Sequence, residues 1–220
     1  MITIVDQTFW MLTMLVEAFV VCLFFVQGLS GRFFLFNAYF LLSVLISIGR
    51  YIVFTRSGVS SLEYAYLYFY SEGLLSFFLF LSLFEISTRL GGTKMLRSIN
   101  LLLSVGTLLA TALFSFQITS VARFRPTHFV FEFSQNVYVV SCLAIAILWI
   151  QKLSNDPQDR TAARFVNVLT VYFLLFLLGY GVRQLAPQDL SLMNSLGQMT
   201  GAWLPLGCGF ALVSKNGRQE

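Results

Sequence analysis

Residues 64–86 of the chain, YAYLYFYSEGLLSFFLFLSLFEI, decide the fold. The stretch is an almost unbroken apolar run, and about 20 such residues are what an α-helix needs to cross the hydrocarbon core of a bilayer. One acidic residue, Glu72, lies well inside the run. An ionisable group at that depth costs on the order of 2.5–3.5 kcal/mol on insertion scales, so it marks either function or a buried pairing.

The composition of the whole chain agrees with a membrane environment. Of 220 residues, 57% are hydrophobic and 11% are charged, and the mean hydropathy is +0.78. Soluble domains carry about 25% charged residues. No polar stretch approaches the roughly 50 residues that a separate domain needs, so we predict a single membrane domain over residues 1–220.

The fold class predicted from these features is an all-α integral membrane protein, a seven-transmembrane-helix bundle with short loops. Apolar windows place the spans near 8–30, 34–55, 64–86, 99–118, 129–151, 164–184 and 191–213. Turn-forming residues separate them: Gly31, Gly58, Gly91, Gly92, Pro126, Asn155, Pro157 and Pro187. No Lys or Arg precedes the first apolar run, so we expect this span to be retained rather than cleaved as a signal peptide.

The positions of Lys and Arg predict the orientation of the bundle. Most lie in the first, third and fifth loops and the C-terminal tail: Arg32, Arg89, Lys94, Arg97, Lys152, Arg160, Arg164, Lys215 and Arg218. The opposite loops hold Arg56, Arg123 and Arg125. Because basic loops stay in the cytoplasm, the N-terminus is expected outside and the C-terminus in the cytoplasm.

Several chemistries are disfavoured by what the spans contain. The cysteines Cys22, Cys142 and Cys208 form no CxxC pair, and His128 is the only histidine, so neither a metal site nor a bis-histidine haem is predicted. No lysine lies within a span to carry a retinal Schiff base. We therefore predict no cofactor, no metal and no catalytic residue, and an intramembrane enzyme is only a third alternative. The net charge of +4 is dispersed over helix ends and does not indicate nucleic acid.

With this orientation, polar residues gather in the outer halves of the spans. The candidate ligand-binding or proton-linked residues are Glu17, Arg50, Tyr68, Glu72, Glu132, Gln135, Asn136, Arg183, Asn194 and Gln198. Residues three or four apart share a helix face, and such polar stripes are expected to face the bundle interior rather than lipid. The inner halves are nearly all apolar. The sequence thus predicts a polar pocket that opens outward and is sealed beneath.

Two interpretations of these charges stay open. The glutamates form a proton, cation or ligand site, or they pair with Arg50 and Arg183 to set the packing. The two arginines alternatively clamp an anion or extend to the membrane interface. Two arginines cannot neutralise Glu17, Glu72 and Glu132, which favours a functional carboxyl group. On that basis Glu72→Gln is expected to leave folding intact and abolish activity.

Two longer patterns concern packing and symmetry. Gly197-x-x-x-Gly201 predicts close helix packing on the seventh span. Tyr39 precedes Arg50 by the same spacing as Tyr172 precedes Arg183, and both pairs lie on spans with the same direction. Such a match is typical of a 3+1+3 parallel repeat, although aromatic helices also match by chance.

The middle helix resembles that of uncharacterised bacterial seven-helix inner-membrane proteins. Tyr68-Phe69-Tyr70-Ser71-Glu72 and Phe84-Glu85 match the aromatic run, glutamate and aromatic-Glu ending of that pattern. The resemblance implies a multi-pass protein of the bacterial inner (plasma) membrane. A weaker likeness to PQ-loop carriers rests on Pro157-Gln158 and Pro187-Gln188, which fall in predicted loops here rather than in helices.

The function predicted from the sequence is small-ligand sensing or binding, receptor-like or carrier-like. The expected partners are the bilayer, a small polar ligand from the outer side, and a membrane or cytoplasmic protein that receives the signal. The alternative is a non-catalytic accessory or scaffold subunit of a membrane complex, whose polar residues serve packing.

Overall fold

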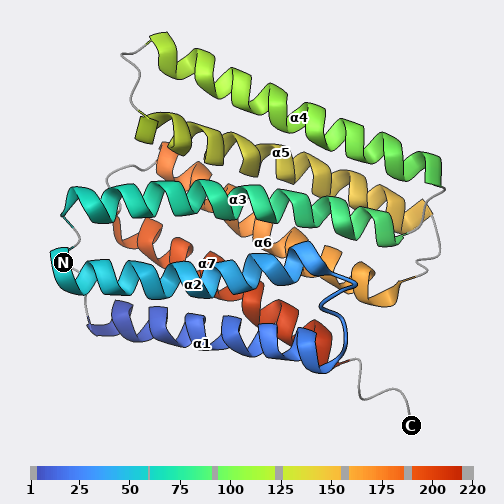
Figure 1. The fold of residues 1–220 in the computed structure, drawn as a ribbon, viewed down its shortest axis with the longest axis horizontal. Helices are drawn as coiled ribbons and strands as arrows, with labels where there is room; N and C mark the ends of the chain where they lie inside the picture. Colours follow the sequence, from blue (N-terminus) through green and yellow to red (C-terminus); the bar gives the residue numbers. More distant parts are fainter. Residues whose placement is uncertain are drawn as a thin grey trace.

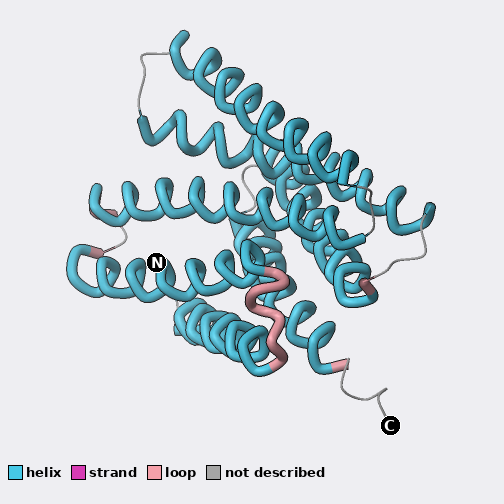
Figure 2. The backbone as a smooth tube through the Cα atoms, turned by 45° about the vertical axis from the view of Figure 1, so that its right-hand side comes forward, coloured by secondary structure: helices cyan, strands magenta, loops and turns pink. Residues whose placement is uncertain are grey.

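The computed structural model describes residues 4–58, 60–90, 94–121, 126–154, 159–185 and 190–214. These residues form seven helices: α1 Ile4–Val26, α2 Phe34–Ser57, α3 Leu62–Leu90, α4 Lys94–Val121, α5 Pro126–Ser154, α6 Arg160–Leu185 and α7 Leu190–Val213. The described residues contain no strand (Figure 2). Predicted loop residues outside the described ranges are Gly91, Gly92, Arg123, Arg125, Asn155, Pro157, Gln158, Pro187, Gln188, Lys215 and Arg218.

The helices confirm the predicted all-α architecture, and six of them are long and apolar enough to cross a membrane. In α4 the described apolar segment is shorter and covers Ser104–Gln117. Many apolar side chains face outward on the bundle surface, among them Leu12, Phe19, Leu45 and Phe210. Such a surface is compatible with contact to lipid rather than water.

The first helix ends earlier than predicted. The predicted span runs to residue 30, but α1 ends at Val26. Gly28 adopts φ 65°, and the amides of Leu29 and Gly28 donate to the carbonyls of Phe24 and Phe25. This is a Schellman motif, in which a glycine in the left-handed region ends the helix. A hydropathy window of about 20 residues does not locate this end, because it averages over the few residues around Gly28.

Six helices form a closed ring in the order α1, α2, α3, α5, α6, α7, and α7 packs back against α1. Helix α3 also contacts α6 across the ring. Helix α4 lies outside the ring, beside α5 and at the edge of α3 (Figure 1). Helix α1 begins at one end of the bundle and α7 finishes at the other (Figure 1). The ring therefore encloses a space to which six helices contribute and α4 does not.

The half of the bundle near the C-terminal end of α7 is filled by aromatic rings. Phe24 of α1, Phe36 and Phe40 of α2, Phe33 just before α2, and Phe165 of α6 are all 0% exposed. We call these five residues the aromatic plug. Their ring centroids lie 5.0–6.5 Å apart in the pairs that contact one another. These are the separations favoured by edge-to-face and offset pairs, so the plug is a packed core with no polar side chain.

Acidic side chains cap two helices beside the plug. The Phe36 amide in the first turn of α2 donates to a carboxylate oxygen of Glu85 on α3 at 3.1 Å. Asp159 accepts hydrogen bonds from the Thr161 and Ala162 amides at the start of α6 and forms a 2.8 Å ion pair with Arg32. Both carboxylates lie where free amides and the helix dipole favour negative charge. Glu85 therefore has a structural role, separate from the other glutamates of the spans.

Candidate functional site

A polar pocket of about 560 Å³ lies inside the ring, in the half of the bundle that holds the N-terminus of α1. All six ring helices line it, through Trp10, Thr13, Glu17, Tyr39, Ser43, Ser47, Arg50, Tyr68, Glu72, Leu75, Gln135, Tyr138, Tyr172, Phe176, Gly179, Tyr180, Gly197, Thr200, Gly201, Leu204 and Pro205. The aromatic plug occupies the other half. The pocket is thus a polar space above an apolar floor.

Each wall of the polar pocket is one face of one helix. On α2 the lining residues Tyr39, Ser43, Ser47 and Arg50 follow one another at helical spacing. The other ring helices contribute residues three or four positions apart in the same way, as the side-chain directions of a helix require. Of the candidate residues named from the sequence, five line this pocket: Glu17, Arg50, Tyr68, Glu72 and Gln135.

The centre of one wall is an Arg50–Glu72 pair that links α2 to α3. The Arg50 guanidinium donates to the Ser71 hydroxyl at 2.6 Å and 3.0 Å, to the Tyr68 carbonyl at 3.3 Å and to the Glu72 carboxylate at 3.5 Å. Its carbon also lies 4.6 Å from the centre of the Tyr68 ring, within range of a cation–π contact. Arg50 is held in the pocket wall by these contacts instead of extending to the membrane interface.

Glu72 is engaged on both of its oxygens. One oxygen faces Arg50, and the other accepts a 3.0 Å hydrogen bond from the Tyr138 hydroxyl on α5. This geometry agrees with the pairing interpretation of Glu72, since a carboxylate between a guanidinium and a phenol has both charge compensation and hydrogen bonds. It joins α2, α3 and α5 at one point.

Glu17 on α1 has a different environment. One carboxylate oxygen accepts a 2.8 Å hydrogen bond from the Ser43 hydroxyl of α2. The other is buried and has no hydrogen-bond partner among the described residues. The residue is only 8% exposed. Burying a carboxyl oxygen without a partner is costly, so Glu17 is the side chain of the pocket with unused binding capacity.

Three buried tyrosines, which we call the tyrosine cluster, line the pocket: Tyr39 on α2, Tyr138 on α5 and Tyr172 on α6. Of these, Tyr138 donates its hydroxyl to Glu72. The Tyr138 ring stacks on Phe176 with a centroid distance of 4.4 Å. Together they give the pocket an aromatic wall with hydroxyl groups at its surface.

Several predicted site residues do not line this pocket. Asn136 faces α4, where its amide donates to the Ser115 hydroxyl at 2.9 Å, although the sequence pattern predicted that it faces the interior. Glu132 and Gln198 are half-buried and are not among the described lining residues. The side chains of Arg183 and Asn194 lie outside the described part of the structure, so their predicted roles stay predictions.

The glycines of α7 correct a packing prediction. A Cβ atom at Gly197 or Gly201 would meet no other atom within 4 Å, and both residues line the pocket. They therefore leave space for the cavity instead of bringing two helices together. Close packing occurs at Gly207, where a Cβ would lie 2.6 Å from Val168, and at Gly73, where it would lie 2.7 Å from Val130.

Sequence reasoning missed the tyrosine cluster and the small polar residues of the pocket. The sequence pattern assigns Tyr39 and Tyr172 only to a possible repeat, and it assigns no role to Tyr138. A signal was present for α2, because Tyr39, Ser43, Ser47 and Arg50 share one face. For Tyr138 the only signal was its position three residues after Gln135, since tyrosine is common in spans for other reasons.

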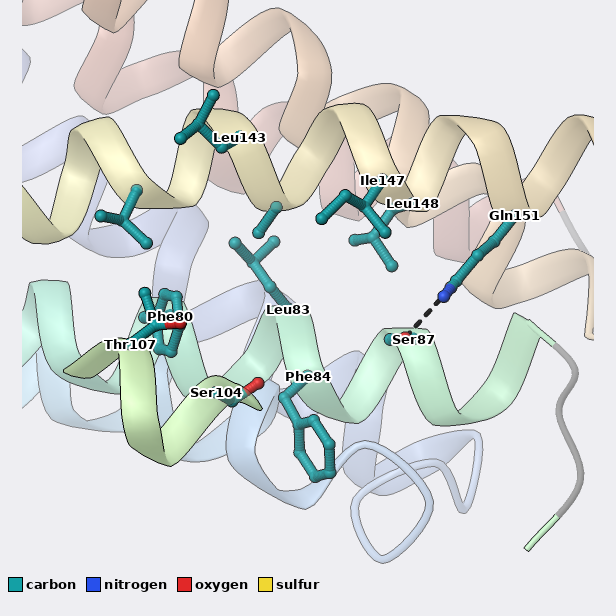
Figure 3. Close-up of a pocket in the computed structure, with 12 residues that line it drawn as sticks. Phe80, Leu83, Phe84, Ser87, Ser104, Thr107, Leu143, Ile147, Leu148 and Gln151 are labelled. Carbon is teal, nitrogen blue, oxygen red and sulfur yellow. Dashed lines mark hydrogen bonds between the residues drawn. The ribbon is translucent and has the colours of Figure 1, made fainter. Parts of the chain in front are cut away.

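A second pocket, of about 310 Å³, lies between α3, α4 and α5 (Figure 3). Leu83 of α3 and Leu148 of α5 lie in its wall, and the hydroxyl of Ser87 donates to Gln151 at 3.0 Å at one end. It has no charged group among its described lining residues. This second pocket therefore offers a ligand no ionic partner among its described lining residues.

Comparison with known proteins does not assign the chain to a family. No protein-family model, no curated protein and no solved structure matches the chain.

Proposed function

We propose that the protein is a seven-span protein of the bacterial inner membrane, with its N-terminus outside, whose polar pocket binds a small polar ligand from the outer side. In this proposal the protein is a sensor. The bacterial location rests on the resemblance of the Tyr68–Glu72 segment, and the orientation rests on the distribution of Lys and Arg.

The proposal of a seventh membrane crossing depends on α4. This helix has 28 residues, which corresponds to about 42 Å at 1.5 Å per residue. It packs alongside α5, which is itself a candidate span (Figure 1). A helix that runs beside a spanning helix over its length passes through the same bilayer. The fourth helix then connects two groups of three, as a 3+1+3 arrangement requires.

The observation that carries the functional proposal is the polar pocket itself. In an apolar bundle, polar residues within spans are expensive and mark ligand or ion sites by default. Here they converge from six helices around a partly open cavity of about 560 Å³, within the range of small-molecule sites. If these residues served packing alone, we would expect their side chains to contact one another and fill the cavity. Arg50 and Glu72 do contact each other, but the rest of the cavity stays open.

Sensing is favoured over transport because the pocket has an apolar floor. A carrier needs a polar route to the other side of the membrane at some stage of its cycle. The aromatic plug lies in that direction and is fully buried. Side chains around it tie helix ends together, for example Arg164, which donates to the Ala211 carbonyl and the Ser214 hydroxyl.

A pocket-filling variant tests ligand binding. Gly201→Leu places a side chain in the open space of the pocket, whereas Gly106→Leu on α4 is a control whose Cβ also meets no atom within 4 Å. Purified proteins in mild detergent are equilibrated with a defined library of small polar metabolites, and thermal unfolding is recorded. The expected result is that at least one compound stabilises the wild type and Gly106→Leu, but not Gly201→Leu.

The same preparation distinguishes the accessory-subunit alternative. If no compound stabilises the wild type and a stoichiometric protein partner co-purifies, the polar residues serve packing and the ligand proposal is wrong. If a compound binds and a partner also co-purifies, the partner is the expected receiver of the signal.

A further inference from the structure

The described charged groups of the polar pocket are not balanced. Two carboxyl groups, Glu17 and Glu72, and one guanidinium, Arg50, line it. Arg50 lies in direct contact with Glu72 and contributes only a longer-range attraction to Glu17. The remaining carboxyl group, Glu17, has one hydroxyl donor and one oxygen without a partner among the described residues.

An anionic ligand does not fit this arrangement. The only described cation of the pocket lining, Arg50, already donates to Ser71, to the Tyr68 carbonyl and to Glu72. An anion would compete with Glu72 for the charge of Arg50 and would lie near the Glu17 carboxyl group. The negative charge of the ligand and that of Glu17 would repel each other strongly, because charges interact more strongly inside a protein than in bulk water.

The other walls suit a positive charge. Tyr39, Tyr138 and Tyr172 present electron-rich rings and hydroxyl oxygens, and Trp10 and Phe176 add two more rings. Aromatic faces attract ammonium groups, and cages of several rings bind quaternary ammonium compounds. Pro205 of α7 has no N–H, so the Gly201 carbonyl beside the pocket loses its regular helical donor and adds another acceptor.

We infer that the polar pocket binds a small organic monocation, an amine or a quaternary ammonium compound, with the Glu17 carboxyl group as its anionic anchor and the tyrosine cluster as its aromatic wall. A bare inorganic ion would leave most of the 560 Å³ volume empty and would make little use of the seven aromatic residues of the lining. The inference rests on the proposed function and specifies its ligand class.

The charge of the ligand is tested with isosteric probes. Choline and 3,3-dimethylbutan-1-ol differ in the replacement of the ammonium nitrogen by carbon, and 3,3-dimethylbutanoate carries the opposite charge. Binding to the full-length protein in mild detergent is measured by calorimetry and thermal unfolding, with choline chloride compared against sodium and potassium chloride at equal ionic strength. Ethylammonium serves as the primary-amine probe. At least one of the two organic cations is expected to bind at least tenfold more tightly than the neutral alcohol.

The anchor is tested with Glu17→Gln, which keeps the size of the side chain and removes its charge. We expect cation affinity to fall at least tenfold while that of the neutral alcohol changes less than twofold. Glu63→Gln, an exposed glutamate at the start of α3, is the matched control and should bind like the wild type. The comparison of probes on the wild-type protein stands even if Glu17→Gln does not fold.

Other outcomes overturn the inference at different levels. Equal binding of choline, ethylammonium and the neutral alcohol, or preference for the butanoate, overturns the cationic class but leaves a ligand-binding pocket. Equal stabilisation by sodium or potassium overturns the organic class. Failure of every probe overturns the inference, and only an equally negative metabolite library would also remove the proposed function.

Discussion

At the scale of single residues, the glutamates of the spans divide into groups with different environments. Glu85 caps a helix, Glu72 is shared between Arg50 and Tyr138, and Glu17 has a free oxygen. The same residue type thus caps a helix in one case, joins three helices in another and keeps an oxygen without a partner among the described residues in the third.

The Arg50–Glu72 pair predicts that Glu72→Gln destabilises the protein. Gln keeps a hydrogen-bond acceptor for Tyr138 but leaves Arg50 without its counter-charge. Because the pair is partly exposed, we expect a loss of about 1–2 kcal/mol in the free energy of unfolding, below the value for a fully buried pair. Unfolding in detergent, followed by circular dichroism, measures it.

The double variant Arg50→Gln/Glu72→Gln is the control for this prediction. It removes both charges, so it should be less destabilised than the sum of the two single variants. A Glu72→Gln protein that is as stable as the wild type but has lost its ligand response would instead support the interpretation reached from the sequence alone.

At the scale of elements, helix ends and helix contacts are set by a few specific atoms. The ends of α1 and α2 depend on Gly28 and Gly58, each with positive φ, and the start of α2 depends on a carboxylate from α3. The contact between α3 and α5 is close at Gly73, where no side chain larger than hydrogen fits without movement of Val130. These features determine how the pocket walls are held relative to one another.

Glu85→Ala is predicted to weaken the start of α2. The Phe36 amide loses its acceptor, and the loss of a helix cap costs about 0.5–2 kcal/mol. Glu85→Gln keeps an acceptor and should lose less. Thermal unfolding of both variants checks the order. A Glu85→Ala protein that unfolds at the wild-type temperature would contradict the capping role.

Gly73→Ala is predicted to destabilise the α3–α5 contact. The new Cβ would lie 2.7 Å from a methyl carbon of Val130, and overpacking of this kind costs about 1–3 kcal/mol. The second-site change Val130→Ala should restore part of the loss. Gly49→Ala on α2, where a Cβ meets no atom within 4 Å, is the matched control and should be neutral or slightly stabilising.

At the scale of the whole molecule, the ring of six helices and the peripheral helix α4 occupy separate places in the fold. Six helices enclose the polar pocket above the aromatic plug, and α4 packs outside them on α5. The pocket is lined from all six ring helices, and the plug fills the other half of the bundle.

The proposed topology predicts which loops react from which side. In a protein whose native cysteines Cys22, Cys142 and Cys208 are replaced, Ser60→Cys between α2 and α3 should react with a membrane-impermeant maleimide in intact cells. Ser30→Cys between α1 and α2 should react only after the cells are permeabilised. The reverse pattern would show the opposite orientation, and labelling of both in intact cells would contradict a spanning α2.

The sequence by itself determined the helices, because length and hydropathy are local properties of a segment. The spans from residue 34 onward agree with the helices to within a few residues, while the first ended earlier at a glycine that hydropathy does not detect. The polar stripes on α2 and α3 were also predictable, since helical periodicity decides which residues share a face.

Only the tertiary structure decided what each face meets. Periodicity gives neither the rotation of a helix relative to its neighbours nor their separation. For this reason Gly197 and Gly201, expected in a helix contact, border a cavity, and Asn136, expected in the interior, bonds to α4. The pairing of Glu72 with Arg50 and the free oxygen of Glu17 likewise depend on distances between helices, which no single segment of the chain contains.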